Sequence, residues 1–175
     1  MNSPYRMSRR EFLKANTLIA SGLCAGAFAS GAGITAAIAR EQSAAFEVLR
    51  SPQIWKKLLS PDQYAVLREE ATEKKYSSPL LNEKREGTYH CAGCDLPVYS
   101  SITKYDSRTG WPSFWDANSN AIGTREDNSL FLTRTEVHCR RCGGHFGHIF
   151  DDGPQPTGKR HCLNGLALIF RPKSG

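Results

Sequence analysis

The sequence predicts a compact, mainly β domain with antiparallel strands, preceded by one or two short helices. Two observations predict this fold class. After Tyr76, short β-rich segments alternate with turn residues, a pattern typical of antiparallel sheets. Before Tyr76, residues 60–63 carry the signals of a helix start. Once the first 39 residues are set aside, the remaining chain is long enough for one domain with a modest core and too short for two.

The first 39 residues resemble a twin-arginine export signal. Ser8-Arg-Arg-Glu-Phe-Leu-Lys14 matches the signal pattern, and an uncharged run of mostly Ala, Gly, Leu and Ile follows up to Ala39. The run ends on Ala-Ile-Ala, a small-residue cleavage site. A retained membrane anchor is the alternative, because the run is long enough to span a bilayer. Its many small residues favour removal, so we expect export to the periplasm and no stable membrane span after cleavage.

The charge of the mature chain gives no case for a nucleic-acid partner. The full chain has a formal net charge of +6, but four Lys and Arg residues and one acidic residue precede Arg40. Most of the imbalance is therefore lost on processing, and no stripe rich in Lys and Arg remains. Residues 40–53 are polar and predict a flexible tether. Residues 54–173 are then the expected domain.

A short amphipathic helix is expected from about Pro61 to Thr72. Ser60 is a suitable N-cap, Pro61 suits the first helical position, and Gln63 can complete a capping box. The apolar residues of this helix recur at helical spacing and are expected to pack on a sheet. They are Tyr64, Leu67 and Ala71.

The strands are expected where β-formers cluster between turn signals such as Asn82-Glu83, Asn118-Ser-Asn120 and Asp152-Gly-Pro154. No internal repeat is present beyond two Cys-x-x-Cys pairs. The expected strands are Gly87–Cys91, Leu96–Ser100, Ser129–Thr133, Glu136–Cys139, Phe146–Phe150 and Leu163–Arg171.

Four cysteines predict a structural zinc clamp. They are arranged as two Cys-x-x-Cys pairs, and each such turn points two sulfurs at one ion. The alternative is a pair of disulfides, which an exported protein makes more plausible. A disulfide that closes so small a ring adds little by loop closure, so the pattern favours zinc. The expected metal ligands are Cys91, Cys94, Cys139 and Cys142.

Cys162 is the one cysteine of the mature chain outside these pairs, and it is a candidate nucleophile. A buried apolar cysteine on a strand is the alternative. The basic neighbours Lys159, Arg160 and His161 favour its thiolate form, and Asn164 falls on the same side of an extended strand. His145 and His148 can supply a proton near neutral pH. Together with the thiol these residues predict a site for redox chemistry at sulfur.

An aromatic segment supplies a third part of this site. Lys104 to Trp115 contains two Trp and a Phe around Gly and Pro residues. The aromatic residues can form a corner of the core, and we expect this for Trp115. Trp111 lies on a turn between Gly and Pro, where its indole face suits a small apolar group such as the methyl group of a thioether or sulfoxide.

Taken together, these motifs resemble the B-type methionine sulfoxide reductases, which reduce the R epimer of methionine sulfoxide. The resemblance runs from about Trp55 to Pro172. It rests on the following segments in order: Lys56–Leu67, the two Cys-x-x-Cys pairs, Lys104–Ser107 with Gly110–Phe114, Gly144–Asp151 and Arg160–Asn164. The family fold implied is a small structure of two antiparallel sheets with peripheral helices and one zinc ion held by the two Cys-x-x-Cys pairs.

The resemblance also implies residue roles. Cys162 would attack the sulfoxide sulfur and become a sulfenic acid, with His148 and His145 acting on the sulfoxide oxygen. Asn164 would complete the catalytic set. The substrate-binding residues implied are Trp111, which would receive the methyl group, Arg160 and Phe150. The substrate would be methionine sulfoxide, free or in oxidised proteins.

Two positions depart from the family pattern. Many members carry a resolving cysteine where this chain has Thr109, and a tyrosine is usual where it has His161. With the other mature thiols on metal, we expect a thioredoxin-like protein or a small thiol to reduce the sulfenic acid directly. Two rival interpretations remain. One is a zinc-ribbon interaction module without catalysis, and the other is a disulfide isomerase that uses a metal-free Cys-x-x-Cys pair.

Overall fold

The structure is a computed structural model that describes residues 46–129 and 132–174. The expected export signal at residues 1–39 and the first part of the expected tether lie outside these residues. Among the helices described, none is both long enough and apolar enough to cross a bilayer.

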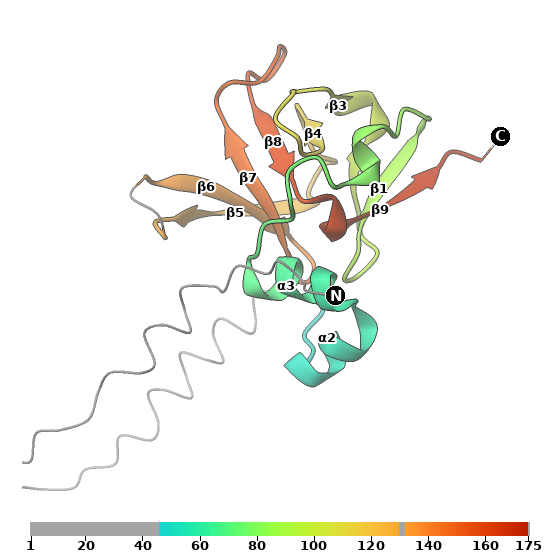
Figure 1. Ribbon diagram of the computed structural model, residues 1–175, viewed down its shortest axis with the longest axis vertical. Helices are drawn as coiled ribbons and strands as arrows, with labels where there is room; N and C mark the ends of the chain where they lie inside the picture. The colour runs from blue at the N-terminus through green and yellow to red at the C-terminus, as the bar shows by residue number, and fades with distance from the viewer. Residues whose placement is uncertain (1–45, 130–131, 175) are drawn as a thin grey trace, which may run out of the picture. The chain divides into compact units, whose positions relative to one another are not determined.

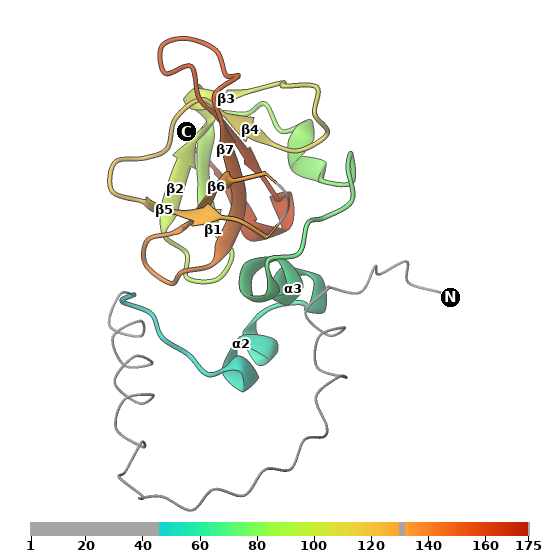
Figure 2. The ribbon, with the colours of Figure 1, turned by 90° about the vertical axis from the view of Figure 1, so that its left-hand side faces the viewer.

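Two short helices open the described chain, α2 at Pro52–Leu58 and α3 at Pro61–Glu69. The capping box expected for α3 is present: Gln63 N donates to Ser60 Oγ at 3.1 Å, and Ser60 N donates to Gln63 Oε1 at 3.1 Å. The helix ends at Glu69, earlier than expected, because Glu70 adopts the left-handed conformation with φ of 58°. Both helices lie at the same end of the two sheets (Figure 1 and Figure 2).

The described part of the expected tether, residues 46–53, packs on the domain and is not a flexible linker. Val48 N donates to Arg141 O at 2.9 Å, and the ring of Phe46 meets the ring of His138 edge to face at 5.7 Å. Helix α2 then starts at Pro52, within the range expected to be tether. Residues 46–53 therefore belong to the fold, which the polar composition of this stretch did not indicate.

The strands form two antiparallel sheets, as the fold class predicted. The smaller sheet has the order β2-β1-β9 and the larger has β3-β4-β8-β7-β6-β5 (Figure 1, with β2 labelled in Figure 2). The smaller sheet contains β1 (Gly87–Cys91), β2 (Pro97–Ser100) and β9 (Leu168–Pro172). The larger contains β3 (Lys104–Tyr105), β4 (Ser113–Phe114), β5 (Ile122–Asp127), β6 (Arg134–Cys139), β7 (His145–Phe150) and β8 (Arg160–Leu163).

The strand expected at Ser129–Thr133 was wrong. The described residues of this segment lie in the turn that joins β5 to β6. Asp127 Oδ1 accepts from Ser129 N at 2.9 Å, and Asn128 Oδ1 accepts from Thr133 Oγ1 at 2.7 Å, so side chains of Asp and Asn close the turn. The real strand, β5, precedes it and was missed because its centre is exposed and polar.

The strand expected at Leu163–Arg171 is two strands in different sheets. Strand β8 ends at Leu163, a short 3-10 helix, η4, occupies Gly165–Ala167, and β9 follows. The break has a distant cause, because the carboxylate of Glu73 accepts hydrogen bonds from the backbone N–H groups of Gly165 and Leu166. Through this break the chain passes from the larger sheet to the smaller one.

The core lies between the two sheets and is largely aromatic. Tyr89 and Tyr99 of the smaller sheet and Phe114 of the larger are fully buried. The ring centroids of Tyr89 and Phe114 are 4.9 Å apart, and those of Tyr99 and Phe114 are 4.7 Å apart. This packing fixes β4, which pairs with β8 and so places the strand that carries Cys162.

Candidate active site and metal cluster

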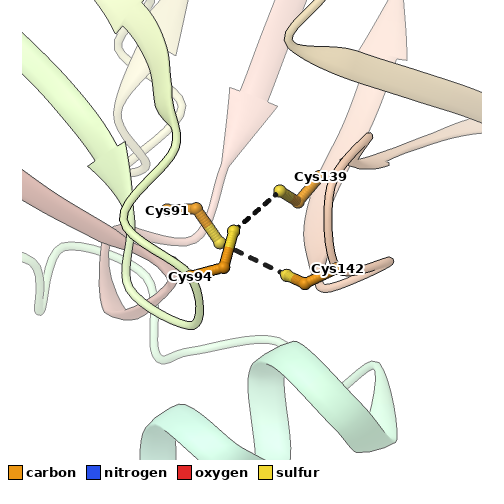
Figure 3. A group of neighbouring side chains, drawn as sticks. All are labelled: Cys91, Cys94, Cys139 and Cys142. Carbon is orange, nitrogen blue, oxygen red and sulfur yellow. Dashed lines mark hydrogen bonds between the residues drawn. The ribbon is translucent and has the colours of Figure 1, made fainter. Parts of the chain in front are cut away.

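The four cysteines of the two Cys-x-x-Cys pairs form one cluster. Cys91 ends β1, Cys94 lies in the turn after it, Cys139 ends β6 and Cys142 lies in the turn before β7. Their sulfur atoms all lie within 4.8 Å of one another (Figure 3). The cluster thereby joins the smaller sheet to the larger one.

The spacing of the sulfurs fits one tetrahedral ion and does not fit disulfides. Cys91 Sγ and Cys142 Sγ are 3.7 Å apart, and Cys94 Sγ and Cys139 Sγ are 3.5 Å apart. A disulfide requires about 2.05 Å. Four thiolates at about 2.3 Å from a central zinc ion would be roughly 3.8 Å apart. All four thiols are free of disulfides, so the geometry favours metal ligation.

Cys162 lies in the middle of β8, between strands on both sides. It pairs with Ser113 of β4 and with His148 of β7. Its side chain is half-buried, so it is held in a sheet but remains accessible. Strand β7 approaches closely because it carries Gly147, where a Cβ atom would collide with the carbonyl oxygen of Cys162.

Of the three basic neighbours expected around Cys162, only Arg160 shares its side of the strand. His161 is buried on the other side, with Nδ1 3.0 Å from the hydroxyl oxygen of Tyr99, and its burial lowers its pKa. Lys159 is exposed and pairs with Asp151. Of the three basic neighbours expected around the thiol, the structure therefore places His161 and Lys159 away from it.

Arg160 is fixed by an ion pair and an aromatic ring. Its Nε and Nη2 atoms donate to the two carboxylate oxygens of Asp152 at 2.8 and 2.9 Å. Its guanidinium carbon also lies 4.3 Å from the centroid of Phe150. These hydrogen bonds hold the pKa of Asp152 below its usual range. Arg160 and Phe150, both expected at the substrate site, thus form one rigid unit.

His148 lies opposite Cys162 and has a carboxylate partner. Its Nε2 atom is 2.8 Å from Asp127 Oδ2. Burial disfavours the charged form of Asp127, but hydrogen bonds from Ser129, His148 and Arg134 outweigh it and hold its pKa well below the usual range. A carboxylate can only accept, so Nε2 carries the hydrogen and Nδ1 is left for another partner. Burial lowers the pKa of His148 despite the opposing effect of Asp127.

His145 has a similar arrangement, more deeply buried. Its Nδ1 atom donates to Glu136 Oε1 at 2.7 Å, and both side chains are almost fully buried. Arg125 also binds Glu136. Burial raises the pKa of Glu136, but the hydrogen bonds from His145 and Arg125 outweigh it and lower the pKa overall. The rings of His145 and His148 are 5.5 Å apart, so the two histidines are neighbours, as predicted.

Asn164 is buried, and both ends of its amide group are engaged. Its Nδ2 atom donates to Phe146 O at 3.0 Å, and its Oδ1 atom accepts from Glu73 N at 2.9 Å. The side chain is buried. Both ends of the amide thus bind backbone groups.

Trp111 is half-buried and lies beside the strand that carries Cys162. Its Nε1 atom donates to Glu73 O at 3.2 Å, and the next residue, Pro112, accepts from Leu163 N at 2.9 Å. The partly exposed indole expected from the sequence is therefore present. It is held by Glu73, which the sequence did not mark as part of the site.

A chain of hydroxyl groups leads away from the thiol. Thr109 Oγ1 is 3.8 Å from Cys162 Sγ and 2.8 Å from Ser107 Oγ. Ser107 Oγ is in turn 2.7 Å from Ser113 Oγ. Thr109, the position where a resolving cysteine is common in the resembled family, therefore lies directly against the candidate nucleophile.

Several residues at this site were missed by sequence reasoning. Asp127 and Glu136 orient the two histidines, Asp152 orients Arg160, and Glu73 contacts both Trp111 and Asn164. Each is an acidic residue separated in sequence from the group that it binds. Nothing in the stretch of sequence around such an acidic residue indicates its distant partner, so no local signal in the sequence could have found them.

Comparison with known proteins identifies the family. A family model described as SelR domain matches residues 59–172. "Peptide methionine sulfoxide reductase MsrB" of Methanosarcina barkeri is 50% identical over 125 residues, which cover 71% of this chain and 88% of that protein. The MsrB of Agrobacterium fabrum is 42% identical over 127 residues, which cover 72% of this chain and 94% of that protein.

A vertebrate relative matches as well. "Methionine-R-sulfoxide reductase B2, mitochondrial" of Danio rerio is 50% identical over 127 residues, which cover 68% of this chain and 71% of that protein. The family model spans the part of the chain that forms the two sheets, the cysteine cluster and the Cys162 site. The chain belongs to the SelR-domain family of B-type methionine sulfoxide reductases, a family of oxidoreductases.

Proposed function

We propose that this protein reduces the R epimer of methionine sulfoxide to methionine, with Cys162 as the nucleophile, and so repairs oxidised proteins or free methionine. The observation that carries the proposal is the placement of Cys162, half-exposed on β8 and paired in register with His148. Family membership supplies the reaction class, and the names of the relatives supply the substrate.

The first step transfers one oxygen atom from the substrate to the enzyme. The Cys162 sulfur attacks the sulfoxide sulfur while the sulfoxide oxygen is protonated. The attack forms a sulfur–sulfur bond. The hydroxyl group then migrates to the Cys162 sulfur, so that a new sulfur–oxygen bond forms there while the old sulfur–oxygen bond and the sulfur–sulfur bond break, methionine leaves and Cys162 becomes a sulfenic acid. The thiol is oxidised by two electrons and the sulfoxide is reduced by two.

His148 is the group proposed to serve the sulfoxide oxygen. Its Nε2 atom is committed to Asp127, which leaves Nδ1 to carry a proton toward the substrate. The carboxylate of Asp127 also stabilises the imidazolium form that must precede this transfer. His145, held by Glu136, lies beside His148 and is proposed to supply the second polar contact.

The remaining pocket residues are proposed to orient the sulfoxide. The exposed face of Trp111 would receive the methyl group, because an indole face accommodates a small apolar group well. Arg160, locked against Asp152 and Phe150, would shape the polar side of the pocket without moving. Asn164 is proposed to act through the backbone groups that it binds, since both ends of its amide are engaged.

Regeneration is proposed to require an external thiol. The cysteines of the described chain other than Cys162 all lie in the four-cysteine cluster. Thr109, 3.8 Å from Cys162, offers a hydroxyl where a resolving thiol would stand. Two equivalents of a small thiol, or one dithiol protein of the thioredoxin kind, would reduce the sulfenic acid to the thiol and release water.

The four-cysteine cluster is proposed to hold one structural zinc ion. Cys91, Cys94, Cys139 and Cys142 would be its ligands, and when bound the ion would fill a closed tetrahedral shell with no position for substrate. The role assigned to these residues is mechanical, since they connect β1 of the smaller sheet to β6 and β7 of the larger.

The proposal is tested by turnover of the separated R and S epimers with dithiothreitol as reductant. We expect methionine from the R epimer alone, and none from a Cys162→Ser variant. A zinc-ribbon interaction module would give no methionine from either epimer. A disulfide isomerase would need a metal-free pair, so one tightly bound zinc per chain together with methionine formation would exclude it.

We also propose that the protein is exported by the twin-arginine route and acts in the periplasm. The support is the segment from Ser8 to Ala39, with its arginine pair, its uncharged run and its small-residue cleavage site. Mass spectrometry of protein from the periplasmic fraction should find a chain that begins at Arg40. A change of the arginine pair to lysines should keep the precursor in the cytoplasm.

A further inference from the structure

Glu73 is a buried carboxylate that the proposed reaction does not use. It lies in the connection between α3 and the short 3-10 helix η2 (Pro79–Leu81), and it is only 8% exposed. Among the described residues, no Lys, Arg or His side chain forms an ion pair with it. A carboxylate buried without a cation is costly, so its contacts must compensate for lost hydration.

The side chain of Glu73 binds the backbone that follows Cys162. Its Oε1 atom accepts from Gly165 N at 2.6 Å, and its Oε2 atom accepts from Leu166 N at 3.1 Å. These are the first N–H groups of η4, which have no partner within that helix. Gly165 has no room for a side chain beside this contact, because a Cβ atom there would lie 1.9 Å from Ser78 Oγ.

The backbone of Glu73 binds two residues of the proposed active site, Asn164 and Trp111. Its N–H group donates to Asn164 Oδ1 at 2.9 Å, and its carbonyl oxygen accepts from Trp111 Nε1 at 3.2 Å. The bond from Nε1 is the hydrogen bond that orients the Trp111 ring. Glu73 therefore connects the loop that carries the indole to the turn just beyond the nucleophile.

We propose that Glu73 is a positioning residue that sets the place of the Trp111 indole relative to Cys162, and through it the affinity for the methyl group of the substrate. The inference rests on the proposed function, because it takes Trp111 as the residue that receives this group. The carboxylate anchors the Glu73 backbone to η4, and the anchored carbonyl oxygen then holds the indole.

The nucleophile itself is held by other contacts. Cys162 lies in β8, which pairs with β4 and β7, and none of these strands contains Glu73. Loss of the carboxylate should therefore shift the indole and weaken substrate binding while the thiol keeps its place and its reactivity. A residue with a general structural role would lower the stability without this selectivity.

The test compares Glu73→Gln and Glu73→Asp with the control Glu86→Gln. Glutamine keeps the shape of the side chain, but one of its two ends is an NH2 group that faces a backbone N–H. Aspartate keeps the charge but is one methylene too short to reach both N–H groups from an unmoved backbone. Glu86 is exposed and its side chain pairs with Lys173.

Three quantities are measured on the full protein with free methionine R-sulfoxide and dithiothreitol. They are KM and kcat, the rate at which iodoacetamide alkylates Cys162, and the indole 15N–1H resonance of Trp111, assigned by its absence in Trp111→Phe.

For Glu73→Gln we expect a KM raised about tenfold, in keeping with one charge-assisted hydrogen bond. The rate at which iodoacetamide alkylates Cys162 should stay within about twofold of wild type, a change smaller than the loss of one hydrogen bond to Cys162 would cause. The indole resonance of Trp111 should shift. Glu73→Asp should fall between wild type and Glu73→Gln, and Glu86→Gln should match wild type.

The possible outcomes separate this inference from the proposed function. An unshifted indole resonance together with an unchanged KM would overturn the positioning role. A shifted resonance with an unchanged KM would leave Glu73 as the residue that places the indole, but it would overturn the assignment of Trp111 to the substrate. Absence of turnover in wild type would overturn the proposed function alone.

A measurement on the unaltered protein keeps the inference testable even where neither Glu73 variant folds. The indole hydrogen of Trp111 should exchange with solvent more slowly than that of Trp115, whose ring nitrogen donates no hydrogen bond within the described residues. The protection of the Trp111 indole hydrogen, relative to an unprotected indole, should also match the protection of the Gly165 amide hydrogen relative to an unprotected amide, since both hydrogens bond to Glu73. Exchange of the Trp111 indole as fast as that of Trp115 would overturn the positioning role.

Discussion

A change of Thr109 to cysteine should give this protein an internal resolving thiol. The Thr109 hydroxyl oxygen lies 3.8 Å from Cys162 Sγ, and a cysteine side chain at the same position places a sulfur where the hydroxyl now is. A small rotation of the two side chains would bring the sulfurs to bonding distance, about 2.05 Å. One turnover with methionine sulfoxide should then convert the sulfenic acid on Cys162 into a disulfide with the new cysteine, with loss of water.

The size of the effect follows from the loop that the disulfide closes. The two positions are separated by 53 residues. The chain-entropy relation gives a loop of this length a stabilisation of about 4 kcal/mol at 25 °C. At roughly 3–5 °C per kcal/mol for a domain of this size, the upper limit for the rise in Tm is about 12–20 °C. Strain in the native state usually reduces such gains, so we expect a rise of roughly 5–15 °C.

The assay compares Thr109→Cys with Arg108→Cys after one equivalent of sulfoxide and without reductant. The neighbouring Arg108 side chain is exposed, so a cysteine there gives a matched thiol at the surface of the same loop. Mass analysis should find the internal disulfide, and Tm should rise, in Thr109→Cys alone. Oxidised Thr109→Cys that retains a free sulfenic acid, with the Tm of its reduced form, would contradict the placement of Thr109 against the nucleophile.

The remaining predictions concern the metal cluster and the two histidine–carboxylate pairs. Chelation, with metal loss confirmed by elemental analysis, should unfold the domain in circular dichroism, because the cluster joins the sheets; unchanged melting would contradict this. Because burial keeps the pKa of His148 below its usual value, kcat should rise as pH falls from 8 to 6, and His148→Asn should flatten that profile. Glu136→Gln should lower the free energy of unfolding by about 2–3 kcal/mol in urea titrations, since His145 and Arg125 lose a charged partner. In wild type the lowered pKa values of Glu136 and Asp127 mean that stability is fully present above about pH 5 and declines as pH falls further, which melting curves across pH should show.

The features that the sequence predicted are those with a local cause. The capping box at Ser60 and Gln63 depends on two residues three positions apart, and strand β1 has the bounds that its pattern indicated. The cysteine cluster was also predictable, because each Cys-x-x-Cys turn gathers two sulfurs by itself. The pairing of the two turns then followed from the coordination that four thiolates prefer.

The features that the sequence did not predict depend on contacts between distant residues. The end of β8 is set by Glu73, which lies about ninety positions earlier, as the separation in its hydrogen bonds to Gly165 and Leu166 shows. The orientation of His148 is set by Asp127, at the end of a strand too polar to be recognised. The side of the strand on which each basic neighbour of Cys162 lies could be inferred from β alternation, but the partners Asp151, Asp152 and Tyr99 could not.

The two histidines illustrate why the acidic residues matter for function. Each imidazole has one nitrogen bound to a carboxylate, Asp127 for His148 and Glu136 for His145. These bonds determine which ring nitrogen remains free, and so from which direction each imidazole would donate a proton in the proposed reaction. The sequence predicted the two histidines as proton donors, whereas the structure shows how their rings are oriented.

Whether Cys162 takes the oxygen atom of the substrate is tested most directly by a single turnover without reductant. Wild-type protein incubated with excess methionine R-sulfoxide should form one methionine per chain and stop. Mass spectrometry should then place one added oxygen on Cys162, with no disulfide to any of the four clustered cysteines. Methionine formed by Cys162→Ser, or an oxygen found elsewhere while Cys162 stays reduced, would contradict the account.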